Sequence, residues 1–151
     1  DKVTGETIDT TVEFIKIAEK DYKNWKFDWS IPQSQGYDIY ALRVKNSEVI
    51  EGLVALEENK GNKGIYVNLI ESAPHNYGTD GKYEGVGGPL FAFACKRAKE
   101  IGFDNIYFEV KTSLIEYYKN KFRAESIMFT NRMFIEGEPF ESLISTYFKE
   151  V

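Results

Sequence analysis

The sequence has very few residues of the types that build disulfides, metal sites and catalytic triads. Cys95 is the only cysteine and His75 the only histidine among 151 residues. A lone cysteine cannot form an internal disulfide, and one cysteine with one histidine does not make the cluster that binds zinc. The sequence therefore predicts no metal site, and it leaves a histidine-based triad few partners to choose from.

Long apolar runs and an excess of positive charge are also missing. No apolar stretch approaches the ~20 residues of a membrane-spanning helix, and no secretory signal is visible. These absences predict a cytoplasmic protein with no membrane partner. The 19 Lys and Arg residues are outnumbered by 24 Asp and Glu residues, giving a net charge of -5 without a basic stripe. We therefore expect no nucleic-acid partner.

Apolar residues are frequent enough for one packed core. Hydrophobic residues make up 42% of the chain and aromatic residues 15%, so disorder is not expected. A length of 151 residues suits one domain, and no repeat, low-complexity tract or linker divides the chain. The sequence predicts a single domain over residues 1–151.

Hydrophobic periodicity gives a coarse order of elements. Thr10 and Glu13 form a capping box, and apolar residues at helical spacing follow, which predicts a first helix over residues 10–25; these are Phe14, Ile15, Ala18, Tyr22 and Trp25. Strands are expected at 37–44, 48–57, 65–70 and 105–110, helices at 89–101, 113–121 and 138–150, and a hairpin over 126–135. The first three strands suggest an antiparallel meander. The expected fold class is mixed α/β, with a mainly antiparallel central sheet flanked by helices.

The stretch KYEGVGGPLFAFA, residues 82–94, places three glycines directly before the helix expected at Pro89. Glycine loses the most conformational freedom on folding, so Gly85, Gly87 and Gly88 require a reason. The first N–H groups of a helix have no internal partner and attract phosphates, and glycines leave that approach open. Lys82 could add a positive charge. A tight strand-to-helix turn is the alternative interpretation.

Two familiar phosphate-binding motifs do not match this loop. The P-loop ends in Gly-Lys followed by Ser or Thr, whereas this loop ends in Gly-Gly-Pro. The dinucleotide fingerprint needs a third glycine where the chain has Leu90.

A third motif fits better. Residues 82–87, Lys-Tyr-Glu-Gly-Val-Gly after an antiparallel meander, resemble the Gln/Arg-x-x-Gly-x-Gly/Ala loop of the GCN5-related N-acetyltransferase (GNAT) superfamily. The resemblance extends over roughly residues 10–150 in element order and over residues 69–124 in motif. Lys82 stands where the family has Gln or Arg. The resemblance implies a GNAT-like fold and an acetyl-CoA-dependent N-acetyltransferase that moves an acetyl group directly to a primary amine of a small molecule or peptide. The alternative is a non-catalytic GNAT-like module that binds CoA or regulates.

The resemblance also implies site residues. Acetyl-CoA, with no metal, would be bound by the glycine loop and the strand and helix beside it: Leu69, Ile70, Lys82, Gly85, Val86, Gly87, Gly88 and Leu90. Glu71, at the end of the central strand, is the expected general base, directly or through a water; a solvated or salt-bridged carboxylate is the alternative. His75 is a competing base or substrate contact, and Asn76 could orient substrate, although both also suit an ordinary loop.

A tyrosine is expected to give a proton to the departing thiolate. Matching the family pattern Tyr-x-Lys-x-Gly-Phe selects Tyr117, with Lys121 in place of the glycine. Matching the end of the helix instead selects Tyr118, with Arg123 in place of the glycine. We favour Tyr118, and a tyrosine used only for packing is the alternative.

The acceptor and the oligomeric state are less determined. Trp25 and Trp29 lie where the family often builds its acceptor pocket, but we favour the alternative that they close the core. The final hairpin of the family often contributes to dimers, so a homodimer is an open expectation.

Overall fold

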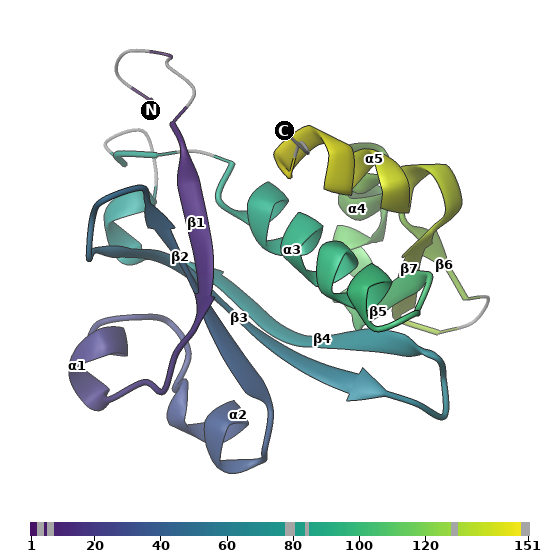
Figure 1. Cartoon of the computed structure of the whole chain (residues 1–151), viewed down its shortest axis with the longest axis horizontal. Coiled ribbons are helices and arrows are strands. Elements are labelled where there is room, and N and C mark those ends of the chain that lie inside the picture. Colours follow the sequence, from purple (N-terminus) through teal and green to yellow (C-terminus); the bar gives the residue numbers. More distant parts are fainter. Residues whose placement is uncertain (3–4, 6–7, 78–80, 84, 128–129, 149–151) are drawn as a thin grey trace. The chain divides into compact units, whose positions relative to one another are not determined.

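The computed structural model describes residues 1–2, 5, 8–77, 81–83, 85–127 and 130–148. Its strands form one sheet in the order β1-β2-β3-β4-β5-β7-β6 (Figure 1). They are β1 (Thr10–Phe14), β2 (Asp38–Val44), β3 (Ile50–Asn59), β4 (Gly64–Ser72), β5 (Asn105–Glu109), β6 (Glu125–Ser126) and β7 (Arg132–Glu136). The pair β4–β5 is parallel, whereas β1–β2, β2–β3, β5–β7 and β6–β7 are antiparallel. The predicted fold class is confirmed.

The helices are α1 (Glu19–Tyr22), α2 (Ser30–Ser34), α3 (Gly87–Glu100), α4 (Ile115–Phe122) and α5 (Gly137–Tyr147), with 3-10 turns η1 (Pro74–Asn76) and η2 (Thr112–Leu114). Helix α3 begins at Gly87, two residues before the predicted start. Pro89 is tolerated there because the first turn needs no internal donor. In the part of the chain that the structure describes, no helix has the length and apolar composition needed to cross a membrane.

The predicted helix over residues 10–25 is wrong. Residues 10–14 form β1, which pairs antiparallel with β2 so that Phe14 lies opposite Tyr40. Their rings meet edge-on, 5.8 Å apart. Two threonines and a valine begin the segment, and β-branched residues favour an extended backbone. Strand pairing therefore prevails over the helical spacing.

Three of the five apolar residues behind that prediction do share a core. Ile15, Tyr22 and Trp25 all pack against one cluster in which Trp29 is fully buried; its other buried members are Ile17, Ile39, Ala41, Leu53 and Ala55. The chain brings them there through an irregular path that contains only the short helices α1 and α2. Trp29 closes the core, as one of the two expectations for it proposed.

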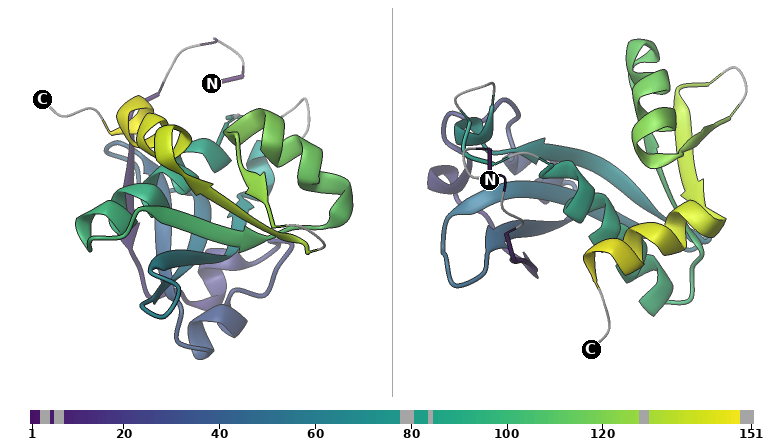
Figure 2. Two further views of the ribbon diagram at one scale, coloured as in Figure 1. Left: turned by 90° about the vertical axis from the view of Figure 1, so that its right-hand side faces the viewer. Right: turned by 90° about the horizontal axis from the view of Figure 1, so that it is seen from above.

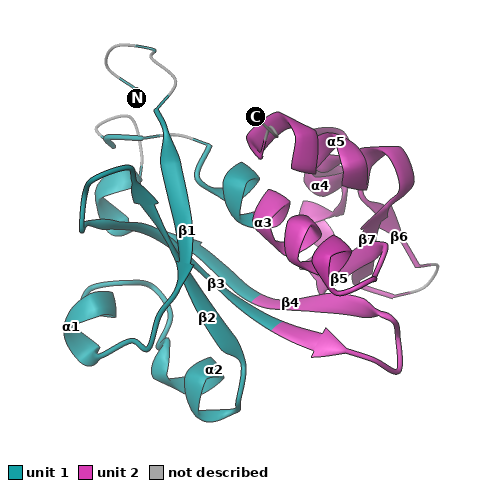
Figure 3. Ribbon diagram, in the orientation of Figure 1, with its two compact units in different colours: residues 1–56, 69–90 teal, residues 57–68, 91–151 magenta. Residues whose placement is uncertain are grey.

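The chain forms two compact units, and β3, β4 and α3 each pass from one into the other (Figure 3). Unit 1 comprises residues 1–56 and 69–90, and unit 2 comprises residues 57–68 and 91–151. The apolar cluster around Trp29 belongs to unit 1. A single domain over residues 1–151 stays a prediction.

Unit 2 has an aromatic core of its own. The Phe91 ring of α3 lies 5.1 Å from Phe108 of β5 and 4.8 Å from Phe122 of α4. Met133 and Ile135 of β7 are fully buried. Helix α5 runs directly on from β7 (Figure 2) and buries Phe140.

Candidate functional site

The glycine bend before α3 exposes main-chain donors. Gly85 has φ +72°, a conformation that favours glycine, and a Cβ on Gly85 or Gly87 would meet nothing within 4 Å. Among the described residues, the amides of Gly85, Val86, Gly87 and Gly88 donate no hydrogen bond. The bend thus presents open N–H groups at the start of a 14-residue helix, where an anion is attracted.

Packing against β3 fixes the conformation of the glycine bend. A Cβ on Gly52 of β3 would lie 2.6 Å from Val86 Cγ1 and 3.0 Å from Leu90 Cδ1. Val86 and Leu90 are buried, so their side chains hold the bend and only their main chain can face a ligand. Gly52 is therefore required for the loop to lie this close to the strand.

Lys82 stands at the exposed start of the same loop. Its amide donates to the His75 carbonyl at 3.0 Å, and its Nζ lies 5.2 Å from the Tyr83 ring. The Tyr83 amide donates to Asn76 Oδ1 at 3.0 Å. These bonds tie the loop to η1, while the Lys82 ammonium remains at the surface.

Leu69 and Ile70 lie where β4 continues beyond its described pairing with β5. The last described pair is Val67 with Phe108, whereas β4 extends to Ser72. Because successive amides of a strand point to opposite sides, one of the two residues directs its N–H away from β3. Both residues are half-buried.

Glu71 is a buried carboxylate with four donors. It accepts hydrogen bonds from the Lys26 amide at 2.7 Å, the Phe27 amide at 3.2 Å, Trp29 Nε1 at 2.9 Å and the Tyr77 hydroxyl at 3.0 Å. Each oxygen accepts two of these bonds. Its side chain therefore holds the segment between α1 and α2 against β4, and its role as general base stays a prediction.

The bond to Glu71 also affects Tyr77. Burial of the phenol, the hydrogen bond to Glu71 and the charge of that carboxylate together raise the pKa of Tyr77 to about 12. Tyr77 therefore keeps its proton well above neutral pH. Tyr77 as a whole is 47% exposed.

A second buried carboxylate, Glu51 of β3, was not identified from the sequence. His75 Nε2 lies 2.6 Å from Glu51 Oε1, and Asn76 Nδ2 donates to the same oxygen at 3.0 Å. Glu51 is only 4% exposed. The polar atoms of the Asn76 side chain are all bonded within the protein, so Asn76 positions Glu51 and Tyr83; its predicted contact with substrate stays a prediction.

A β-bulge accounts for the orientation of Glu51. Leu42 of β2 pairs with Gly52, but the next residue, Arg43, pairs with Ile50, so Glu51 is an extra residue on β3. A bulge redirects the extra side chain and is common near functional sites. No local residue pattern marks this bulge in the sequence.

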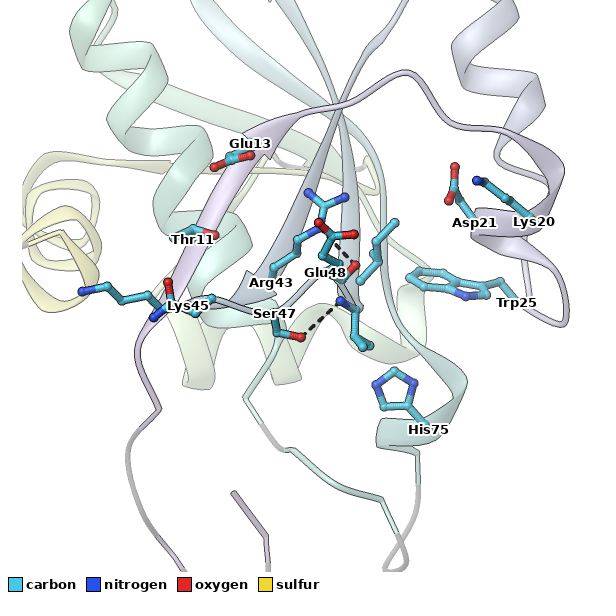
Figure 4. A pocket seen from close by; sticks show the side chains of 13 residues that line it. Thr11, Glu13, Lys20, Asp21, Trp25, Arg43, Lys45, Ser47, Glu48 and His75 are labelled. Atoms are coloured by element: carbon cyan, nitrogen blue, oxygen red, sulfur yellow. Dashed lines mark hydrogen bonds between the residues drawn. The ribbon is translucent and has the colours of Figure 1, made fainter.

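An open cleft of about 1000 Å³ lies beside His75 in unit 1 (Figure 4). Trp25, with α1 residues, forms one wall, and β1 with the β2–β3 turn forms the other. The remaining lining residues are Thr11, Glu13, Lys20, Asp21, Arg43, Lys45, Asn46, Ser47, Glu48, Val49 and Ile50. The cleft is mainly polar, and the His75 ring points toward it (Figure 4).

The two candidate tyrosines belong to unit 2, whereas the other predicted site residues belong to unit 1. Tyr117 is 52% exposed. Tyr118 is half-buried, with its ring 5.3 Å from Phe108 and 6.0 Å from Phe122. Burial, and then the neighbouring Tyr117, raise the pKa of Tyr118, so its phenol carries a proton at neutral pH.

The end of α4 favours the second of the two alignments. Arg123, the C-cap residue, is left-handed with φ +53°. That conformation is the one that glycine adopts most readily after a helix. This conformation agrees with the alignment that places the glycine of the family pattern at Arg123, and the choice of Tyr118 over Tyr117 stays a prediction.

Comparison with solved structures identifies the fold. An acetyltransferase from Bacillus subtilis in complex with CoA is 15% identical, covers 85% of this chain and 99% of its own, and superposes with a TM-score of 0.59. A GNAT-family protein from Desulfovibrio desulfuricans is 12% identical, with 84% and 98% covered and a TM-score of 0.58. No protein-family model and no curated protein matches the sequence. The chain has the GNAT acetyltransferase fold, as the loop resemblance predicted.

The comparison corrects one expectation. The AtaT–AtaR complex bound to DNA contains a chain that is 18% identical, with 88% of this chain and 98% of that chain covered and a TM-score of 0.59. The KacTA–DNA complex matches as well. The prediction of no nucleic-acid partner is wrong. Chains of this fold occur in complexes with DNA, and a negative net charge does not exclude such complexes.

Metal ligands are sparse in the described part of the chain. There, no three His, Cys, Asp or Glu side chains gather where they could hold an ion. Cys95 is buried, and burial raises the pKa of its thiol far above the ordinary value. The thiol is therefore protonated and packed.

Proposed function

We propose that the protein is an acetyl-CoA-dependent N-acetyltransferase that transfers an acetyl group directly to a primary amine of a small molecule or peptide. The observation that carries the proposal is the set of amides at Gly85–Gly88 that donate no hydrogen bond within the described residues, together with the open space at Gly85 and Gly87, where a Cβ would meet nothing within 4 Å. The GNAT fold supports it, since a CoA complex is known for a similar structure.

The residues would divide the binding of acetyl-CoA among them. The amides of Gly85, Val86, Gly87 and Gly88 would hold the pyrophosphate, and Lys82 would add a charge. An amide of Leu69 or Ile70 would stabilise the negative charge that develops on the thioester oxygen. The buried side chain of Leu90 would keep the bend in place.

Tyr118 would donate a proton to the departing thiolate, because its raised pKa keeps the phenol protonated. The incoming ammonium must lose a proton before it can attack. Glu71 and His75 are the candidate acceptors in unit 1, and the four donors on Glu71 leave His75 with the freer atoms.

The proposal is tested by thermal unfolding with CoA, with pantetheine as the control that lacks the pyrophosphate. At 100 times its Kd, CoA should stabilise the protein by about 2.7 kcal/mol, a rise in Tm of several degrees, and pantetheine should act far more weakly. No shift with millimolar CoA would contradict the proposal.

A non-catalytic CoA-binding or regulatory module is the second candidate. The full hydrogen bonding of Glu71 favours it, because a base with no free lone pair catalyses poorly. Release of free thiol from acetyl-CoA in the presence of an amine panel distinguishes the two. Binding without release would identify the module.

A further inference from the structure

We propose that the cleft beside His75 binds an acceptor that carries both an amine and a carboxylate, an amino acid or a peptide. His75 takes the proton from the amine, and Arg43 holds the carboxylate. The assignment rests on the proposed acetyltransferase function and names its substrate class. All of its residues belong to unit 1.

The hydrogen bonds fix which nitrogen of His75 is free. Glu51 Oε1 accepts a hydrogen bond from Asn76 and lies 2.6 Å from His75 Nε2, so Nε2 carries the hydrogen of the neutral ring. Within the described residues Nδ1 has no hydrogen-bond partner. The side chain is 42% exposed and lines the cleft. The Nδ1 lone pair of His75, whose Nε2 contacts the buried Glu51 carboxylate, is therefore available to an amine in the cleft.

Glu71 differs on each of these points. Its two oxygens already accept four hydrogen bonds, and it does not line the cleft. An acceptor amine would have to displace one of those donors to reach it. His75 requires no such rearrangement.

The charges of the cleft indicate the class of acceptor. Three side chains are acidic (Glu13, Asp21, Glu48) and three are basic (Lys20, Arg43, Lys45). Within the described residues none of the six takes part in an ion pair. A polyamine would favour a mostly acidic wall and a polyanion a mostly basic one, whereas equal numbers of both signs suit a zwitterion.

Arg43 is the best-positioned anion holder in the cleft. Its Nε donates to the Glu48 carbonyl at 3.3 Å, which anchors the half-buried side chain and leaves the other guanidinium N–H groups for a ligand. A guanidinium can bind a carboxylate through two parallel hydrogen bonds. Arg43 also flanks the bulge that redirects Glu51. The β-bulge at Glu51 thus positions both groups that would hold the acceptor: Arg43, which flanks it, and His75, which contacts Glu51.

The transfer step balances with these groups. The acceptor ammonium gives a proton to His75 Nδ1, and the amine lone pair forms a C–N bond with the acetyl carbonyl carbon. The C–S bond breaks, and the thiolate takes the proton of Tyr118. The nitrogen then gives up its second proton, which passes through solvent to the Tyr118 phenolate, and solvent removes the first proton from His75, so that one proton is released for each acetyl group transferred.

The sole histidine permits a direct binding test. The His75 ring Cε1–H gives one NMR signal in tag-free protein, and it can be followed in the CoA complex while amino acids and dipeptides are added, each paired with its carboxamide. The acids should shift the signal at concentrations at least tenfold lower than the carboxamides. Arg43→Met should remove that preference, whereas Arg132→Met, in unit 2 and outside the cleft, should retain it.

Kinetics test the role of His75 as proton acceptor. His75→Gln keeps a donor for Glu51 but lacks the basic nitrogen, so kcat should fall by ~10²–10⁴, with KM for the acceptor and Kd for CoA little changed. The acidic limb of the pH–rate profile should disappear as well.

Other charged groups also face the cleft, and their contributions to the pH–rate profile have to be distinguished from that of His75. The charged groups around it are Glu51 of β3, Lys20 and Asp21 of α1, Glu13 of β1, Arg43 of β2, and Lys45 and Glu48 of the β2–β3 turn. Asp21→Asn and Glu48→Gln should each leave the acidic limb in place. Loss of the limb in either variant would assign the titration to that carboxylate and overturn the role of His75.

The remaining outcomes distinguish the two proposals. Wild-type kcat in His75→Gln, or carboxamides bound as well as acids, would overturn the acceptor assignment, while CoA binding together with thiol release in the presence of an amine would still uphold the acetyltransferase function. Preference for a polyamine would also overturn it. Absence of any stabilisation by CoA would be a failure of the proposed function itself.

Discussion

The two buried carboxylates of unit 1, Glu51 and Glu71, have different surroundings. Glu71 accepts hydrogen bonds from two main-chain amides, the Trp29 indole and the Tyr77 phenol. All four bonds are internal to the protein. Glu51 binds His75, whose ring opens to the cleft. Two similarly buried carboxylates therefore differ in their partners: the bonds of Glu71 are internal to the protein, whereas Glu51 contacts a ring that opens to the cleft.

Gly87→Ala separates the ligand-binding interpretation of the glycine bend from the turn interpretation. A Cβ at Gly87 meets nothing within 4 Å and lies in the first turn of α3, so the free protein should be as stable as wild type or up to about 1 kcal/mol more stable. The added methyl group would stand among the open amides and should weaken CoA binding at least tenfold. Chemical denaturation and calorimetric titration measure the two effects.

A matched control comes from Gly102, whose φ is +88° and which closes α3. Gly102→Ala should lower stability by about 1 kcal/mol because an alanine is strained there, and CoA affinity should not change. Unaltered CoA affinity in Gly87→Ala would mean that the glycines serve only the turn.

Tyr77 should make stability depend on pH in the alkaline range. Its pKa is about 12 in the folded protein and near ~10 in the unfolded chain. Between these values the folded state retains a proton that the unfolded chain loses, so this contribution is complete below pH ~10 and is lost as pH rises toward 12. The difference in unfolding free energy between wild type and Tyr77→Phe should shrink over that range in urea denaturation. A constant difference would show that the bond to Glu71 does not control the phenol.

At the scale of elements, sequence patterns located what is regular and missed what depends on distant partners. β2 to β5 and α3 were predicted because their apolar patterns are long and bounded by turn residues. β1 was taken for a helix because Ile15, Tyr22 and Trp25 are spaced like a helix face, although they reach one core by an irregular path. The pairing of β1 with β2 decides the conformation of residues 10–14, and the sequence of that segment alone does not indicate the pairing.

The same limit applies to the candidate site. The glycine bend was predictable because glycines before a helix have a local physical meaning. The Glu51–His75 pair was not, since it depends on a one-residue bulge between β2 and β3. His75 was recognised as a candidate, but its partner lies 24 residues earlier.

Helix α4 provides a test of the proton donor. Tyr118→Phe keeps the ring that packs near Phe91 and Phe108, so stability should change little, while loss of the phenolic proton should lower kcat by ~10²-fold or more. Tyr117 is exposed, and Tyr117→Phe should act like wild type. Thiol release and thermal unfolding of both variants decide the matter. Equal activity of the two would remove the tyrosine acid from the proposal.

The end of α4 is predicted to be strained. Arg123→Gly should stabilise the protein by about 1 kcal/mol, because φ +53° costs a non-glycine residue about that much. Part of the gain is offset by loss of the exposed pair with Glu138, which contributes little. Glu138→Gln removes the pair without touching the backbone and serves as the control in urea denaturation. Because both variants lack the ion pair, lower stability in Arg123→Gly than in Glu138→Gln would show that the left-handed residue is not strained.

At the scale of the whole molecule, the division into two units does not follow the chain. Unit 1 and unit 2 are each assembled from two segments, and β3, β4 and α3 contribute to both. A cut between units would therefore sever two strands and a helix. Neither unit corresponds to a contiguous piece of chain that could be expressed alone.

This continuity predicts cooperative unfolding. Strands that serve both units cannot melt in one and persist in the other without breaking their own ladders, so calorimetry should show one transition with equal calorimetric and van't Hoff enthalpies. CoA should move that whole transition upward, even though its proposed phosphate contacts lie in unit 1 alone. A substitution confined to the unit 2 core, Met133→Ala, should lower the same single transition. Two resolved transitions, of which CoA shifts only one, would mean that the units fold separately and that residues 1–151 are not one domain.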